Sequence, residues 1–141
     1  MPRATIQLPD KFTYQTKITV RITDINYGGH LGNDTMLSLL QEARIRFLRQ
    51  HNYSETDVEG CGIIMADAVV IYKAQAFYPD TLIIDITATD FSKRACDLIY
   101  RVTRESDNKE IARAKTRIAF FDYHNNITVQ VPAKFQQLFE T

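Results

Sequence analysis

A long segment with a helical apolar pattern constrains the fold more than any other feature of this chain. Residues 33–50 carry apolar side chains at spacings of three and four, which places them on one face of an α-helix. That face consists of Met36, Leu40, Ala43 and Phe47, with Leu37, Leu39 and Leu48 beside it. Asn33 or Asp34 can cap the first turn by accepting backbone N–H groups that have no helical partner. A stripe this broad has to be buried against another layer of the protein.

The remaining segments have the patterns of strands and turns. Apolar and β-branched residues dominate five runs, which we predict as strands: residues 12–22, 63–73, 81–89, 95–104 and 111–121. Residues 52–62 predict a short helical turn that stops at glycine, and Pro132 opens a terminal helix because its fixed φ suits a first helical position. This order predicts an α+β fold in which an antiparallel sheet of five to six strands wraps around one long helix.

The predicted strand at residues 63–73 bears on how that sheet is covered. It is almost entirely apolar between Ile63 and Tyr72, which fits a strand at the sheet centre that is buried on both faces. The long helix can cover only one face. The other face has to be covered by a second subunit or by a smaller element.

Composition limits the classes of protein to which the chain can belong. Its 141 residues suit a single domain over residues 1–141, and 45% hydrophobic residues can form a core. The 17 basic and 17 acidic residues balance, so no overall charge points to nucleic acid or to an anionic membrane. A chain near zero charge also tends to associate, which favours an oligomer. No apolar run approaches the roughly 20 residues of a membrane span. The two cysteines form no C-x-x-C motif, which indicates a cytoplasmic protein without a structural metal.

The stretch DINYGGHLGN, residues 24–33, stands directly before the long helix. Gly28 and Gly29 allow two interpretations. They can form a tight turn that needs a positive φ, or they can let the backbone approach a ligand without a Cβ between them. The second interpretation is chemically interesting, because a helix N-terminus has free N–H groups and a positive dipole.

Several short motifs together resemble the hotdog-fold thioesterases, specifically the 4-hydroxybenzoyl-CoA thioesterase-like superfamily. The family pattern D-x-D-x-x-G-H-V-N-N, followed by E-A-R, is matched here by residues 24–33 and by Glu42-Ala43-Arg44. The family's next strand ends in a tyrosine, followed by a Gly-Asp turn, and these are matched by Tyr72 and Pro79-Asp80. Its isoleucine-proline before a C-terminal helix is matched by Val131-Pro132. The resemblance implies a hotdog fold, a homodimer or homotetramer, an acyl-CoA substrate and no cofactor. This chain departs from the family at Asn26, where the family has its catalytic aspartate. An amide cannot act as a base, so the resemblance implies a base elsewhere, with Asn26 orienting water or the carbonyl.

Thioester hydrolysis needs a polarised carbonyl and an activated water. For the first task we predict the backbone N–H groups of Gly29, His30 and Leu31, at the start of the helix. The His30 side chain can also act as a base, as a donor to substrate or as a structural group. Asp24 is expected to fix the turn.

A carboxylate is needed for the second task, and three positions are candidates. Asp34 lies in the first helical turn, where it can instead be a cap. Glu42 lies eight residues further on and can border the same side of the helix, or pair with Arg44 or Arg46. Asp67 interrupts an apolar strand, where burial would raise its pKa toward the range of a working base. It can act across a dimer, or be a solvated edge residue.

Basic residues can bind the phosphates of CoA. Lys73, Lys93 and Arg94 are our candidates, although ordinary solvated charges explain them equally well. The acyl tail would lie beside Met36, Leu40 and Phe47.

Acyl-CoA hydrolysis is the predicted activity. The alternatives are a module that binds acyl thioesters without hydrolysing them, which Asn26 favours, and a hydratase, which Ile25 disfavours because that activity needs an acid five residues before His30.

Overall fold

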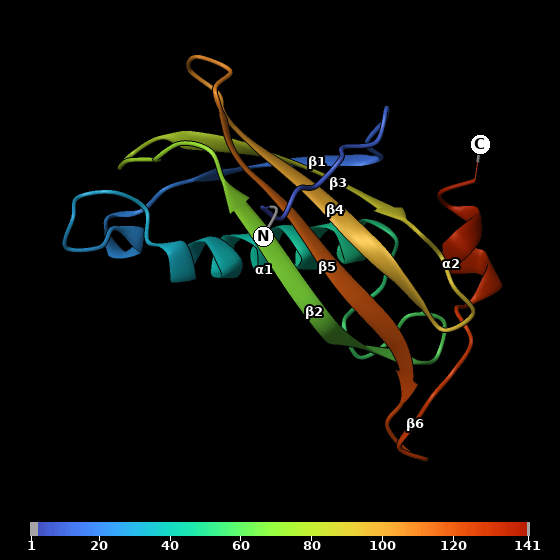
Figure 1. Ribbon diagram of the computed structural model, residues 1–141. Coiled ribbons are helices and arrows are strands. Elements are labelled where there is room, and N and C mark those ends of the chain that lie inside the picture. The colour runs from blue at the N-terminus through green and yellow to red at the C-terminus, as the bar shows by residue number, and fades with distance from the viewer. Residues whose placement is uncertain (1–2, 141) are drawn as a thin grey trace.

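The computed structural model describes residues 3–140 and shows one antiparallel sheet packed against one long helix (Figure 1). The strands are β1 (Tyr14–Thr19), β2 (Gly62–Tyr72), β3 (Thr81–Thr89), β4 (Ala95–Arg104), β5 (Glu110–Asp122) and β6 (Ile127–Thr128). The helices are the 3-10 turn η1 (Ile22–Asp24), α1 (Asn33–Gln50) and α2 (Ala133–Gln137). The strand order is β1-β3-β4-β5-β2, with β6 paired to β5. The predicted α+β hotdog architecture is confirmed.

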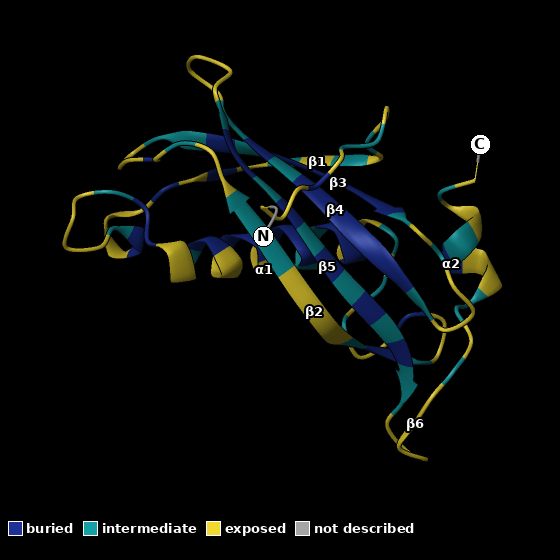
Figure 2. Ribbon diagram, in the orientation of Figure 1, coloured by how far each residue is buried: buried dark blue, intermediate teal, exposed yellow. Residues whose placement is uncertain are grey.

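Period-two alternation in the central strands places their apolar side chains against α1. In β3, Leu82, Ile84 and Ile86 are fully buried, and they pack in one core with Leu40 and Phe47 of the helix. Figure 2 shows this buried layer along α1 and the middle strands. Helix α1 has the predicted bounds, because apolar side chains from its successive turns pack in the core.

The outer face of the sheet is covered in part by the N-terminal segment of the same chain. This segment runs across β4 and β5 (Figure 1), and the Arg113 guanidinium donates to the Ile6 carbonyl over 3.1 Å. Asp85 and Asp97 on this face are consequently buried, and they pair with Arg101 and Arg117 at 3.2 and 3.0 Å. A smaller element of the chain therefore provides some of the cover that the sequence predicts for this face.

Two predictions about local structure are wrong. Strand β2 lies at the edge of the sheet within this chain, and residues 65–68 are exposed (Figure 2). Residues 52–62 form turns with short bridges instead of a helical turn, because Asn52, Glu59 and Gly60 adopt positive φ values that end helices. Pro132 is the N-cap of α2 and precedes its first helical residue. Across residues 3–140, none of the helices has the length and apolarity that crossing a bilayer requires.

Candidate functional site

The Gly28-Gly29 turn is held by the backbone and side chain of Asn26. The Asn26 N–H donates to the His30 carbonyl over 2.9 Å, and the Gly29 N–H donates to the Asn26 carbonyl over 3.0 Å. The Asn26 Oδ1 accepts the Gly28 N–H at 2.9 Å. Gly29 has a φ of +83°, which a residue with a side chain rarely adopts. Asn26 therefore acts as a turn residue in this structure.

Asp24 connects this turn to the strand before it. Its side chain is only 3% exposed and accepts hydrogen bonds from the backbone and guanidinium of Arg21. Burial alone would raise the pKa of Asp24, but the hydrogen bonds and charge of Arg21 outweigh it and lower the pKa. The Asp24 carbonyl also accepts the Gly32 N–H at 3.2 Å. Asp24 thus fixes the turn, as the sequence predicts.

Helix α1 begins at Asn33 without a side-chain cap. Gly32 is the N-cap residue, and its carbonyl accepts the Met36 N–H at 3.1 Å as the first helical bond. The N–H groups of Asn33, Asp34 and Thr35 therefore have no helical acceptor. A Cβ on Gly32 would lie 2.8 Å from Asp34 Oδ1, so the Asp34 carboxylate folds back beside the helix start.

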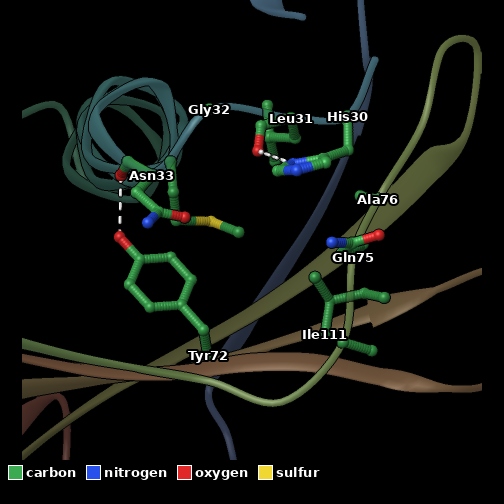
Figure 3. Close-up of a pocket in the computed structure, with 10 residues that line it drawn as sticks. His30, Leu31, Gly32, Asn33, Tyr72, Gln75, Ala76 and Ile111 are labelled. Atoms are coloured by element: carbon green, nitrogen blue, oxygen red, sulfur yellow. Dashed lines mark hydrogen bonds between the residues drawn. The ribbon is translucent and has the colours of Figure 1, made fainter. Parts of the chain in front are cut away.

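A pocket of about 350 Å³ opens at this helix start (Figure 3). Residues of the turn, α1, the end of β2, the connection to β3 and the start of β5 line it: His30, Leu31, Gly32, Asn33, Met36, Tyr72, Ala74, Gln75, Ala76 and Ile111. The Tyr72 hydroxyl donates to the Asn33 carbonyl over 2.7 Å, and its ring bridges the space between sheet and helix. Burial and the nearby charge of Asp34 raise the pKa of Tyr72, which keeps the hydroxyl protonated as a donor. The sequence prediction did not include Tyr72 among the site residues, although its place at the end of β2 was part of the family pattern.

The three predicted carbonyl-polarising groups differ in what their N–H groups do. The Gly29 N–H is used by the Asn26 carbonyl, and the Leu31 N–H donates to the Ala76 carbonyl over 2.8 Å. The His30 N–H has no acceptor among the described residues, and the His30 Nδ1 lies 3.2 Å from the Leu31 carbonyl. The available donors therefore lie slightly later than predicted, at His30 and in the first turn of α1.

None of the three candidate carboxylates lines the pocket, although Asp34 lies beside Gly32, which does. Asp34 lies at the helix start. Glu42 is on another side of α1, where it pairs with Arg46 at 2.9 Å. Asp67 is the cross-strand neighbour of Arg117, whose guanidinium binds Asp97 on the outer face of the sheet, so Asp67 faces away from α1.

The candidate CoA-binding residues are similarly divided. Lys73 directly follows Tyr72 and lies beside the pocket. Lys93 and Arg94 lie in the connection between β3 and β4, which aligns through β5 with the beginning of β2 and hence with the far end of the sheet (Figure 1). Residues 3–140 contain no cluster of three or more histidine, cysteine or acidic side chains that could hold a metal ion.

The fold and the site define a class of protein: a hotdog domain with a pocket at the start of its central helix. The chain belongs to the thioesterase-like superfamily, whose family model matches residues 20–139. Membership supports thioester hydrolysis as the general activity. A search of curated proteins finds no match.

Solved structures of thioesterases have the same fold. PA2801, a putative thioesterase from Pseudomonas aeruginosa, is 17% identical with a TM-score of 0.85 over 92% of this chain and 100% of that one. The 1,4-dihydroxy-2-naphthoyl-CoA thioesterase Slr0204 from Synechocystis is 18% identical with a TM-score of 0.80, over 89% and 94%. A thioesterase from Thermus thermophilus, complexed with coenzyme A and Zn, is 16% identical with a TM-score of 0.78, over 93% and 100%. At these identities the likeness concerns the fold.

Proposed function

We propose that this protein hydrolyses acyl-CoA thioesters at the start of α1. One observation supports the proposal above the others. Gly32 and Asn33 line a pocket of about 350 Å³, the N–H groups of the first helical turn have no side-chain cap, and the Asp34 carboxylate lies beside Gly32. Hydrolysis needs these two kinds of group next to each other, since one polarises the carbonyl and the other activates water.

In the proposed reaction, the thioester oxygen accepts hydrogen bonds from N–H groups of the first turn. Asp34 removes a proton from a water, whose oxygen forms a bond to the carbonyl carbon. The carbon–sulfur bond then breaks, and the proton passes to the departing sulfur. Because Asp34 becomes neutral while the oxyanion forms, the net charge at the helix start does not change in this step. This matters because two adjacent negative charges at a helix N-terminus would repel each other.

A second copy of the chain completes the proposed site. The exposed edge of β2 has unpaired backbone groups, and Met65 on it is 45% exposed. Antiparallel pairing of two β2 strands would put the beginning of one beside the end of the other. Lys93 and Arg94 of the second copy would then approach Lys73 and the pocket, where CoA phosphates need positive charge. This pairing would also bury the apolar β2 on both sides.

The prediction of a cytoplasmic location agrees with the two free cysteines, Cys61 and Cys96.

One observation favours the alternative of a module that binds acyl thioesters without hydrolysis. The Asn26 amide replaces the family carboxylate, and its Oδ1 is already occupied by the Gly28 N–H. In that case the helix start would hold the thioester, and no group would activate water.

Measuring thiol release from a panel of acyl-CoAs separates the two functions. Changing Asp34→Asn should lower kcat by about a hundredfold or more, because it removes the base while the amide keeps the shape. Glu42→Gln and Asp67→Asn are matched controls and should keep activity. Tight binding of acyl-CoA by the unchanged protein without release at any chain length would establish the module. Full activity of Asp34→Asn would exclude this base.

A further inference from the structure

A buried arginine outside the helix start has a donor that no described residue uses. The Arg44 side chain is on the fourth turn of α1 and the residue is 5% exposed. Its Nε donates to Glu55 Oε2 over 3.1 Å, and its Nη1 donates to the Tyr100 hydroxyl over 3.2 Å. The Nη2 group has no hydrogen-bond partner among residues 3–140. A buried guanidinium that leaves hydrogens unused is costly unless something else accepts them.

An apolar groove between α1 and β2 reaches this arginine. The groove has a volume of about 240 Å³. Its apolar lining residues are Leu37, Leu40, Met65 and Ala68, and its polar ones are Ser38, Gln41, Arg44 and Thr116. In the described part of the chain, Arg101 Nε is the only side-chain polar atom that lacks both solvent contact and a hydrogen-bond partner. Arg44 Nη2 also lacks a partner, so it retains some contact with solvent. The groove that Arg44 lines is the opening through which Nη2 can be reached.

A second unused donor lies in the same network. The Tyr100 and Thr116 hydroxyls are 2.9 Å apart, and either can donate to the other. One hydroxyl hydrogen of this pair remains unused in both arrangements, because each hydroxyl has a single hydrogen. Tyr100 is fully buried and does not line the groove, so the unused hydrogen is on Thr116, at the groove, when Tyr100 donates to Thr116. Arg44 and Thr116 can then both donate to an acceptor in the groove. Arg44 and Glu55 cancel each other's charge, so an acceptor that is itself charged would be buried without compensation.

We infer that Arg44 and Thr116 determine acyl specificity by recognising a neutral oxygen on the acyl group. This inference rests on the proposed function. The substrate class is an acyl thioester with an apolar body and a ketone or hydroxyl oxygen near its far end. Arg44 lies eleven residues after Asn33, which is about 16 Å along the helix at 1.5 Å per residue. Long side chains lean toward the helix N-terminus, so the oxygen lies somewhat nearer than that to the thioester, at a medium-chain distance.

The experiment compares three thioesters of equal length: decanoyl-CoA, an oxodecanoyl-CoA with its ketone on the penultimate carbon, and the CoA monothioester of decanedioic acid. The wild-type protein should prefer the ketone over decanoyl by about tenfold to a hundredfold in kcat/KM, since hydrogen bonds from charged donors stabilise by about 1.5–3 kcal/mol. The carboxylate should be the poorest of the three. Binding of thioether analogues, which cannot be hydrolysed, should show the same order by calorimetry.

Arg44→Met and Thr116→Val should each reduce the ratio of kcat/KM for the ketone to kcat/KM for decanoyl-CoA. Arg49→Met, on an exposed position of the same helix, is the matched control. Thr116→Val keeps the side-chain shape, so it tests the inference even if Arg44→Met does not fold. Ala68→Leu fills the groove beside Thr116, its cross-strand neighbour, and should lower activity on all three substrates.

Three outcomes would overturn the inference. Equal turnover and equal binding of decanoyl and ketone by the wild type would mean that the donors face only water. A preference that survives both Arg44→Met and Thr116→Val would place recognition elsewhere. Unchanged turnover in Ala68→Leu would mean that a second copy of the chain fills the groove. Absence of thiol release from every substrate would instead refute the proposed function, and the analogue binding would still test the specificity.

Discussion

Two glycines near the start of α1 should respond to alanine in opposite ways, and this contrast tests the geometry of the site. Gly32 has φ −68° and ψ 146°, an extended conformation that alanine adopts without strain. Its new Cβ would lie 2.8 Å from Asp34 Oδ1, which is closer than real contacts allow, and 3.3 Å from Thr35 Oγ1. The Asp34 carboxylate must therefore move. Gly29 has φ +83°, and nothing lies within 4 Å of its Cβ position, so alanine there strains only the backbone.

The expected magnitudes differ accordingly. For Gly32→Ala, a displaced base should lower kcat by about a hundredfold, the effect typical of a misplacement of about 1 Å. Its free energy of unfolding should change by less than about 1 kcal/mol, because the weaker N-cap and the stiffer unfolded chain act in opposite directions. For Gly29→Ala, the left-handed conformation should cost about 1–2 kcal/mol, which lowers Tm by several degrees in a domain of this size.

The two variants can be compared by thiol-release kinetics and thermal unfolding on the same preparations. Gly32→Ala should lose activity with nearly unchanged Tm, and Gly29→Ala should lose stability with most of its kcat measured below Tm. The reasoning would be refuted if Gly32→Ala kept full kcat. In that case the Asp34 carboxylate either is not needed or works from a different position. An equal loss of Tm in both variants would also contradict it, since only one position requires a positive φ.

Two further predictions concern the turn and the sheet edge. Asp24→Asn should lower the free energy of unfolding near neutral pH by about 1–3 kcal/mol, because it weakens the buried bonds from Arg21. The folded state lowers the pKa of Asp24, so this stabilisation is present above the unfolded value of about 3.9 and is lost as the pH falls through the folded pKa. Denaturation curves of both proteins should therefore converge in acid, and a constant gap down to low pH would contradict this origin. Met65→Lys should weaken self-association by at least about tenfold, because a charge on an edge strand opposes pairing. Sedimentation should then show a monomer at concentrations where the wild type is a dimer, and an unchanged dimer would place the interface elsewhere.

The spacing of apolar residues correctly predicted the elements that are buried by other parts of the same chain. Helix α1 and strands β3 and β4 have the predicted bounds, because each residue of their repeating patterns meets the core or the surface of this same chain. Strand β2 was misplaced for the opposite reason. Its apolar sequence indicates burial, but residues 65–68 are exposed in this chain. A sequence does not say whether a covering surface would belong to the same chain or to another copy.

A pocket opens at the helix start, where the sequence predicts the site, but two of the three predicted N–H donors are used within the chain. The local capping rules predicted Asn33 or Asp34 as the cap, and this is wrong, because Gly32 is the N-cap residue and no side chain caps the helix. The Leu31 N–H is not available to a substrate because it donates to the Ala76 carbonyl. This hydrogen bond joins residues far apart in the sequence, so no local sequence pattern predicts it. The orientation of Asp67 depends on a single irregularity. Ile63 and Met65 face α1, and alternation would turn Asp67 the same way, but the register shift between Met65 and Asp67 sends it to the outer face.

In the proposed mechanism, the geometry around Gly32 would allow hydrolysis without a carboxylate at position 26. The Cβ position of Gly32 lies 2.8 Å from Asp34 Oδ1 and 3.8 Å from the Cβ of Asn26, so both side chains flank the same glycine. An acid at position 26 or at position 34 would therefore present its charge beside the same N–H groups of the helix start. Because the electrostatic requirement is for one carboxylate near those donors, either position can satisfy it. With the acid at position 34, the amide at position 26 can hold the Gly28-Gly29 turn. A carboxylate at position 26 would instead place a second negative charge beside the developing oxyanion.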